Sequence, residues 1–303
     1  MDLSEVQQIK GAALTVVTNI CANRPEAVDQ VMEECFENKS FIGDLLLNES
    51  SEFVLRQAIQ LCVQLTKHFI DSDDNNNYKT SDEWQRKRLI TDLINTLTQL
   101  IRSQTIGDKH SFLMVCTVLA NISFVQNSNQ TFIKSQTIVC LLSALKANQS
   151  FGKEVLIKDQ LITILANVGR KYPEEVVACN GLVFVLCALQ SRPIVSLQNV
   201  AELLTIERIQ QKCCVCLARL SNDKSIARLV DRLNGVQRLV QLCKEAKERN
   251  FSDTVLLAAI VCIRKIAQTV GKSVFRQLDA MDLIEPKVNE TFCLYSEKNE
   301  TIV

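Results

Sequence analysis

The sequence contains few of the residues that interrupt regular structure. Only 8 glycines and 4 prolines occur in 303 residues, well below their average shares of about 7% and 5%. Sheets joined by tight turns and glycine-rich phosphate loops both depend on glycine, so the composition disfavours them. It favours a helical protein.

A net charge is also missing. The 34 lysines and arginines balance 34 aspartates and glutamates, so no overall field attracts the chain to nucleic acid or anionic lipid. No stretch reaches the roughly 18 uncharged apolar residues that a membrane-spanning helix requires. We therefore expect no nucleic-acid partner and no membrane insertion.

Residues suited to catalysis or metal binding are scarce. The only histidines are His68 and His110, which leaves little scope for Ser/His/Asp or Cys/His catalysis. The C-x-x-C motif Cys213–Cys216 lies in an apolar run without a second pair, whereas zinc needs four converging ligands. We expect no catalytic residue, no metal and no cofactor. An enzyme with an unrecognised site remains the alternative.

Cysteine, in contrast, is frequent. The 13 copies are an odd number and stand mostly singly in apolar runs, where a free thiol packs as a small hydrophobic group. The residues Met1–Glu5 have neither the basic nor the apolar region of a secretion signal. These features predict a reducing, cytoplasmic location.

One segment recurs along the chain. Cys116–Ile122 (CTVLANI) returns as Ile162–Val168 (ITILANV) and as Cys214–Leu220 (CVCLARL). With the weaker copies, the equivalent positions are Val17, Leu65, Leu119, Leu165, Leu217 and Ile263. Their spacing points to a unit of about 46 residues, typical of HEAT and armadillo repeats. Two longer steps predict insertions near residues 71–82 and 191–204.

Other marks divide each unit into three helices. Pro25 and Pro173, each followed by glutamate, suit the first turn of a helix. Asn180-Gly181 and Asn234-Gly235 predict a break before a second, apolar helix. The recurring segment forms the third helix. We predict an all-α, right-handed α-solenoid of about six armadillo repeats over residues 1–290, followed by a flexible tail over 291–303.

Stacked helical repeats form a long concave surface that accepts an extended segment of a partner. In the armadillo family, which this pattern resembles, an asparagine near the end of each third helix bonds the main chain of the bound peptide. The matching positions here are Asn19, Lys67, Asn121, Asn167, Arg219 and Lys265. Three of them are cationic, which favours an acidic or phosphorylated partner segment. Alternatively, the asparagines only cap their own helices and the cations form a solvated face.

The chain ends in Glu300-Thr301-Ile302-Val303. A PDZ domain binds such an end by adding it as a strand, with the carboxylate held by backbone N–H groups and the valine in an apolar pocket. The pattern predicts a PDZ ligand at Glu300, Thr301, Ile302 and Val303.

A longer match lies in the C-terminal units. The segment Arg238–Leu256 (RLVQLCKEAKERNFSDTVL) and the following Ile263–Ile266 (IRKI) resemble the C-terminal armadillo domain of the Inscuteable family. The ending Glu300–Val303 is similar to the PDZ-ligand tail of that family.

This resemblance implies an adaptor in cell polarity that supports spindle orientation and asymmetric cell division. The implied partners are a Bazooka-type PDZ scaffold of the partitioning-defective complex and the Pins/LGN adaptor. The Pins/LGN contact of the family uses a segment before the armadillo units. We expect that segment to be absent because the first repeat helix begins almost at Met1, so the resemblance carries the Pins/LGN contact over only weakly. The implied location is the cytoplasm with recruitment to the apical cortex. The alternative is a general armadillo adaptor or cochaperone with unrelated clients.

Overall fold

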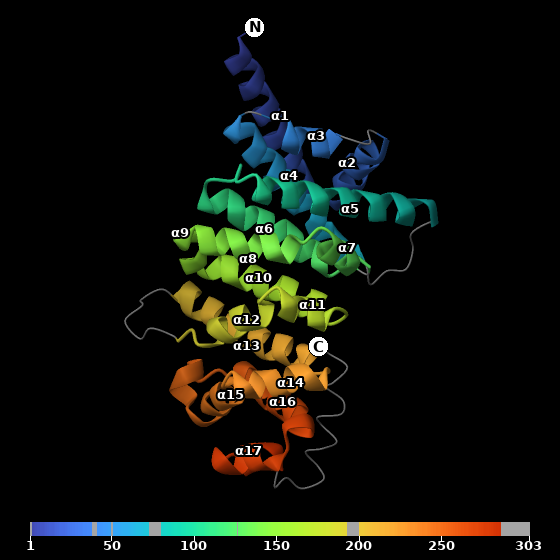
Figure 1. The fold of residues 1–303 in the computed structure, drawn as a ribbon. Helices are drawn as coiled ribbons and strands as arrows, with labels where there is room; N and C mark the ends of the chain where they lie inside the picture. The colour runs from blue at the N-terminus through green and yellow to red at the C-terminus, as the bar shows by residue number, and fades with distance from the viewer. Residues whose placement is uncertain are drawn as a thin grey trace.

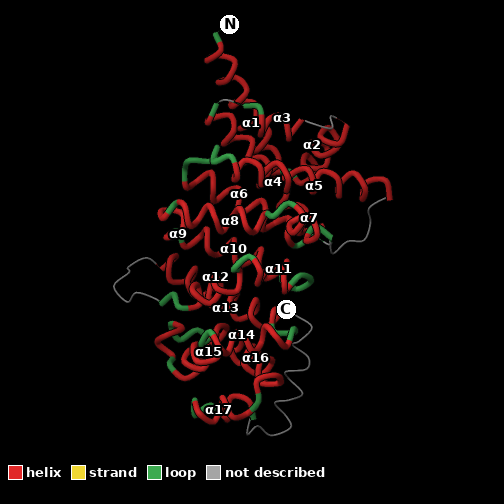
Figure 2. Tube along the Cα trace, in the orientation of Figure 1, coloured by secondary structure: helices red, strands yellow, loops and turns green. Residues whose placement is uncertain are grey.

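The fold was analysed in a computed structural model, which describes residues 2–37, 41–49, 51–72, 80–125, 127–192 and 200–285. All regular structure in these ranges is helical (Figure 2). The helices stack in successive layers from the N-terminal to the C-terminal end (Figure 1). The all-α prediction is therefore confirmed.

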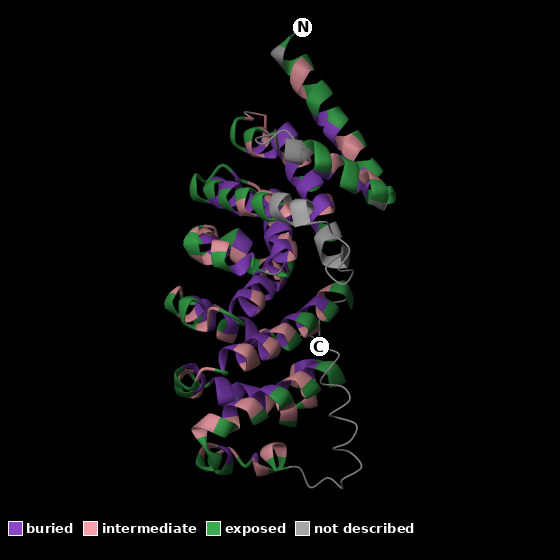
Figure 3. Ribbon diagram, turned by 90° about the vertical axis from the view of Figure 1, so that its right-hand side faces the viewer, coloured by how far each residue is buried: buried purple, intermediate pink, exposed green. Residues whose placement is uncertain are grey.

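The recurring segment forms one long helix in each layer, as predicted. These third helices are α1 (Leu3–Asn23), α4 (Glu52–Ser72), α6 (Lys109–Ser123), α10 (Val155–Val168), α13 (Val200–Leu220) and α16 (Asp253–Val270). Each packs against the next along the stack. Neighbouring helices cover α6 and α10 on several sides, so most of their residues are buried. Buried residues concentrate in the middle of the stack (Figure 3).

Shorter helices complete the layers. The first helices are α2 (Pro25–Glu37), α7 (Asn129–Lys134), α11 (Pro173–Ala178), α14 (Lys224–Arg232) and α17 (Lys272–Gln277). The second helices are α3 (Phe41–Leu47), α8 (Thr137–Ala147), α12 (Gly181–Leu189), α15 (Gly235–Lys244) and α18 (Met281–Ile284). The short α9 (Gln149–Lys153) and the 3₁₀ turn η1 (Ala246–Arg249) lie before α10 and α16. Proline begins α2 and α11, as the sequence predicts.

The breaks between first and second helices follow the Asn-Gly pairs. Asn180 and Asn234 adopt left-handed conformations, with φ of 66° and 60°. The glycines that follow meet the preceding helix closely, since a Cβ on Gly181 would lie 2.7 Å from Val176 Cγ1 and one on Gly235 would lie 2.6 Å from Val230 Cγ1. A larger residue at either glycine would push the two helices apart.

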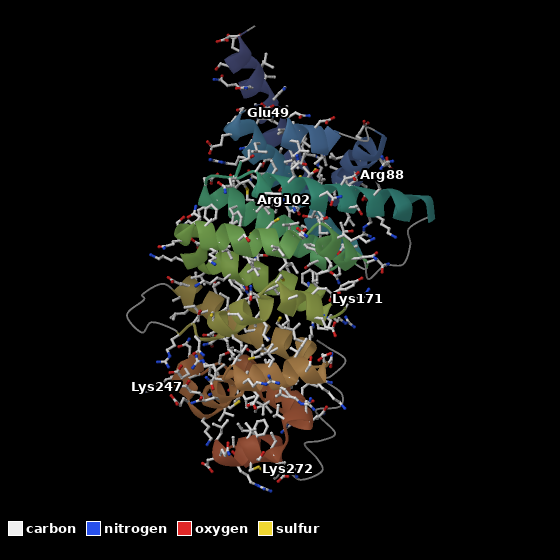
Figure 4. The ribbon with its side chains drawn as sticks, viewed as in Figure 1. Glu49, Arg88, Arg102, Lys171, Lys247 and Lys272 are labelled. Atoms are coloured by element: carbon white, nitrogen blue, oxygen red, sulfur yellow. The ribbon has the colours of Figure 1, made fainter. Side chains whose placement is uncertain are left out.

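One layer departs from the predicted three-helix unit. Between α4 and α6 stands a single helix, α5 (Thr80–Arg102), which packs against the second helices α3 and α8. Its 23 residues contain no glycine or proline, so nothing in this sequence interrupts the helix. At its end, Arg102 (Figure 4) donates a hydrogen bond to the Ser135 carbonyl of the next layer (3.3 Å).

The predicted insertions fall partly outside the described residues. Residues 73–79 and 193–199 are not described, while α4 extends to Ser72 and α13 begins at Val200. The predicted tail, residues 291–303, also lies outside the described ranges. Among the helices that the structure describes, none combines the length and apolarity needed to cross a membrane.

Candidate peptide-binding face

The six predicted site residues occupy the same position on successive third helices. Asn19 and Lys67 are exposed, whereas the other four are half-buried. We call this row the third-helix face, defined by Asn19, Lys67, Asn121, Asn167, Arg219 and Lys265. Because each third helix packs against the next, the stack places one of these residues in every layer.

Three members of the third-helix face form hydrogen bonds to a neighbouring layer. Asn121 Nδ2 donates to Thr66 Oγ1 of α4 (3.2 Å), and Asn167 Nδ2 donates to Ser123 Oγ of α6 (2.9 Å). Both asparagines therefore bond their side-chain amides to the preceding third helix rather than only capping their own.

Arg219 extends this network by one layer. Its guanidinium donates to Asn167 Oδ1 (3.0 Å) and to the Ala166 carbonyl (3.2 Å), both on α10. The Asn167 amide consequently uses its nitrogen toward one layer and its oxygen toward the other. Asn121 keeps its oxygen and one N–H available for a further partner.

Positive charge on this face is partly unpaired. Within the described residues, the side chains of Lys67 and Lys265 have no hydrogen bond or ion pair. In the part of the chain that the structure describes, Arg219 has no carboxylate partner. Burial, followed by the nearby Arg170 guanidinium, lowers the pKa of Arg219.

A second pair of cations shares one buried carboxylate within the protein. The buried Asp159 of α10 accepts bonds at Oδ1 from Arg208 Nε (3.0 Å) and Lys212 Nζ (2.9 Å) of α13. Lys212 also donates to Thr163 Oγ1 (2.7 Å). The sequence analysis missed this cluster, although a single aspartate within the apolar run of α10 was the available signal.

The Cys213–Cys216 motif is a packing element. Both thiols are fully buried, and burial raises the pKa of Cys216 to about 12 and that of Cys213 well above its ordinary value. A buried neutral thiol is a poor nucleophile and a poor metal ligand. No group of His, Cys, Asp or Glu in the described ranges is arranged to hold a metal ion.

The predicted PDZ ligand, Glu300 to Val303, lies outside the described residues. It stays a prediction from sequence.

Comparison with solved structures identifies the fold. A designed armadillo repeat protein superposes with a TM-score of 0.64 at 15% identity, covering 88% of this chain and 94% of the designed one. An engineered protein superposes with a TM-score of 0.62 at 13% identity, covering 88% of this chain and 93% of the other. The predicted armadillo solenoid is thereby confirmed.

Comparison of sequences identifies the family. The family model described as "Protein inscuteable C-terminal" matches residues 7–303. The human protein inscuteable homolog is 29% identical over 296 residues, which cover 96% of this chain and 48% of the human protein. The mouse homolog is 29% identical over 295 residues, with the same coverage. The chain thus spans about half the length of these relatives, and it belongs to the Inscuteable family.

Proposed function

We propose that this chain is a noncatalytic adaptor in cell polarity, located in the cytoplasm and recruited to the apical cortex. It binds a segment of a Bazooka-type scaffold of the partitioning-defective complex, and by this contact it supports spindle orientation and asymmetric division. The observation that carries the proposal is the match of the Inscuteable C-terminal family over residues 7–303.

The third-helix face is the proposed contact for the scaffold. Among the described residues, Lys67 and Lys265 of this face have no partner, while the Asp159 charge is offset by two cations of α13. An extended segment with acidic or phosphorylated side chains complements such a surface. The side-chain oxygen and the remaining side-chain N–H of Asn121 supply a contact for the main chain of this partner segment.

The tail provides a second proposed contact. A terminal valine carboxylate with threonine two residues earlier, Thr301 and Val303, suits a PDZ domain. If both contacts reach one scaffold, binding at one raises the effective concentration at the other. Removing either contact then weakens capture of the scaffold by more than the affinity of that contact alone would predict.

The first experiment tests the tail. The intact chain and a chain lacking residues 300–303 are used to capture proteins from a dividing epithelial cell lysate. We expect the intact chain to recover a PDZ polarity scaffold and the shortened chain to recover less. Recovery of that scaffold by neither chain contradicts the proposal. A peptide of residues 290–303 with one added glycine should lose PDZ binding.

A second experiment tests the third-helix face with purified components. Affinity for the captured scaffold is measured for the Lys67→Glu, Lys265→Glu double variant and for Lys146→Glu. Lys146 is exposed at the end of the second helix α8, so this control changes charge outside the proposed site. We expect binding to weaken at least tenfold for the double variant only. Equal effects would assign the contribution to net charge alone.

A further inference from the structure

The first helix of the array exposes an apolar stripe. Ile9, Val16 and Ile20 of α1 are 57%, 56% and 45% exposed, and Ala13 between them is exposed as well. Their spacing places all four on one face of the helix. The opposite face, with Leu14 and Cys21, is buried on the side that α4 covers.

The same positions are core positions in three later layers, whereas in α4 two of them are the half-buried Gln57 and Gln64. When third helices are aligned by the repeat, the stripe of α1 corresponds to four residues in each of α10, α13 and α16. These are Ile157, Leu161, Ile164 and Val168; Ile209, Cys213, Cys216 and Leu220; and Val255, Ala259, Cys262 and Ile266. None of these twelve is more than 1% exposed. The stripe of α1 is therefore a core surface without its cover.

The layers show what covers these positions elsewhere. In later layers the unit's own second helix packs on its third helix, α12 on α13 and α15 on α16. Helix α1 packs on α4 and on α2, which both follow it in sequence. Among the described helices, none takes the place for α1 that α12 takes for α13, and α1 lies at the end of the stack (Figure 1).

Terminal repeats of soluble solenoids normally present a polar outer face. A row of exposed isoleucine and valine side chains at helical spacing instead marks a surface that another element covers. The cover that fits is a helical hairpin whose second helix is apolar, because in α12 and α15 such a helix packs on the third helix that carries the equivalent positions.

We propose that the α1 stripe, Ile9, Ala13, Val16 and Ile20, is a docking site for a helical hairpin from the N-terminal half of an Inscuteable-family protein. This hairpin would correspond to the first and second helices of a repeat unit. The relatives contain about as much sequence again as the matched half, and the matching family model is their C-terminal one. The partner of this surface is thus the part of such a protein that precedes the matched region.

The test mixes the intact chain with the part of the human homolog that precedes its matched half, expressed as a separate polypeptide. We expect a complex in sedimentation and slower amide hydrogen exchange in α1. Val16→Glu should weaken the complex at least tenfold. The matched control is Val261→Glu, since Val261 is a similarly exposed valine (59%) on the third helix α16, and it should change affinity less than twofold.

Three outcomes overturn the proposal. These are the absence of a complex, a complex that Val16→Glu retains, and α1-dependent self-association of the chain, which would assign the stripe to a second copy. Thermal unfolding of both variants must match the unmodified chain, and Ile20→Ser replaces Val16→Glu if that variant unfolds. Scaffold capture by the tail is measured separately, so failure of one proposal leaves the other to its own result.

Discussion

The Arg219 guanidinium and the Asn167 side-chain oxygen, on neighbouring third helices, are 3.0 Å apart and hydrogen-bonded. Asn167 in turn donates to Ser123 one layer earlier (2.9 Å). Residues that the repeat pattern assigns to partner binding therefore also connect three layers of the solenoid. For a substitution on this face, the free energy of unfolding must therefore be measured as well as the affinity for a partner.

The first prediction separates these two roles. Asn167→Ala removes a bond to each neighbouring layer and leaves the buried Ser123 hydroxyl with fewer partners. We expect the free energy of unfolding to fall by about 1–3 kcal/mol. Lys67→Ala replaces an exposed side chain that has no partner in the described ranges, and it should change the free energy of unfolding by less than about 0.5 kcal/mol. Urea denaturation measures both, and equal losses would contradict the inter-layer role.

The second prediction concerns a buried arginine between α12 and α15. Arg238 donates to the Leu189 carbonyl (3.1 Å), to Gln241 Oε1 (2.9 Å) and to Glu248 Oε2 (2.6 Å). Arg238→Ala leaves the Glu248 carboxylate with only the more exposed Arg192 (3.1 Å). Because one partner of a buried ion pair is lost, we expect a cost of about 3–5 kcal/mol.

The control for this substitution is Arg232→Ala. Arg232 is exposed in the last turn of α14, and its removal should cost less than about 0.5 kcal/mol. Thermal unfolding of the two variants checks the difference. A cost below about 1 kcal/mol for Arg238→Ala would show that the buried bonds contribute little.

The third prediction concerns the pH dependence of stability. Asp108 caps α6 and accepts a bond from the Ser111 N–H (2.9 Å). Burial acts to raise the pKa of Asp108, but hydrogen bonds from Ser111 and the charge of Arg56 outweigh it, so the pKa is lowered in the folded protein. The carboxylate therefore stabilises the fold above its unfolded pKa of about 4, and this contribution disappears as pH falls through the lower folded value.

The measurement compares Asp108→Ala and Asp108→Asn with the unmodified chain. At pH 7 the alanine variant should be less stable by about 1 kcal/mol because the helix cap is lost. This difference should shrink below pH 4. The asparagine variant keeps a capping oxygen without a charge, so its own stability should lack the Asp108 titration. A gap between the unmodified and alanine chains that widens below pH 4 would contradict the assignment.

The fourth prediction concerns thiol reactivity. Burial raises the pKa of Cys216 to about 12, whereas Cys187 is exposed. Alkylation at pH 8 followed by peptide mapping should modify Cys187 at least about a hundredfold faster than Cys216, since the thiolate is the reactive form and must be accessible. In urea the two rates should converge. Rapid native modification of Cys216 would show that the C-x-x-C motif opens.

The repeat, its period and the starts of α2, α11, α12 and α15 followed from the sequence. They depend on local properties: proline fits the first turn at Pro173, and glycine at Gly181 permits a close approach that a side chain would block. The sequence did not predict that the single helix α5 replaces the first and second helices of its layer. A loop insertion and an uninterrupted helix both lengthen the distance between successive copies of the repeat, so the spacing alone does not separate them. The outcome depended on the absence of a breaker residue in Thr80–Arg102.

The contacts of the third-helix face could not be predicted in the same way. The repeat gives the position of Asn167 on its helix, but its bonds depend on the offset between helices that are separated by more than 40 residues in sequence. The Asp159 cluster is a similar case, because Arg208 and Lys212 lie 49 and 53 positions later.

The sequence alone determined that this protein is an all-helical array with one kind of unit, since the apolar period and the turn residues act within single helices. The tertiary structure decided which side chains of that array remain available. Equivalent residues have different roles in different layers: Asn167 and Arg219 bond one another, Lys265 has no partner among the described side chains, and Ile20 is exposed where Val168 is buried. The physical reason is that burial and pairing depend on the neighbouring layers, and among the described helices α1 is covered only by α2 and α4, which follow it.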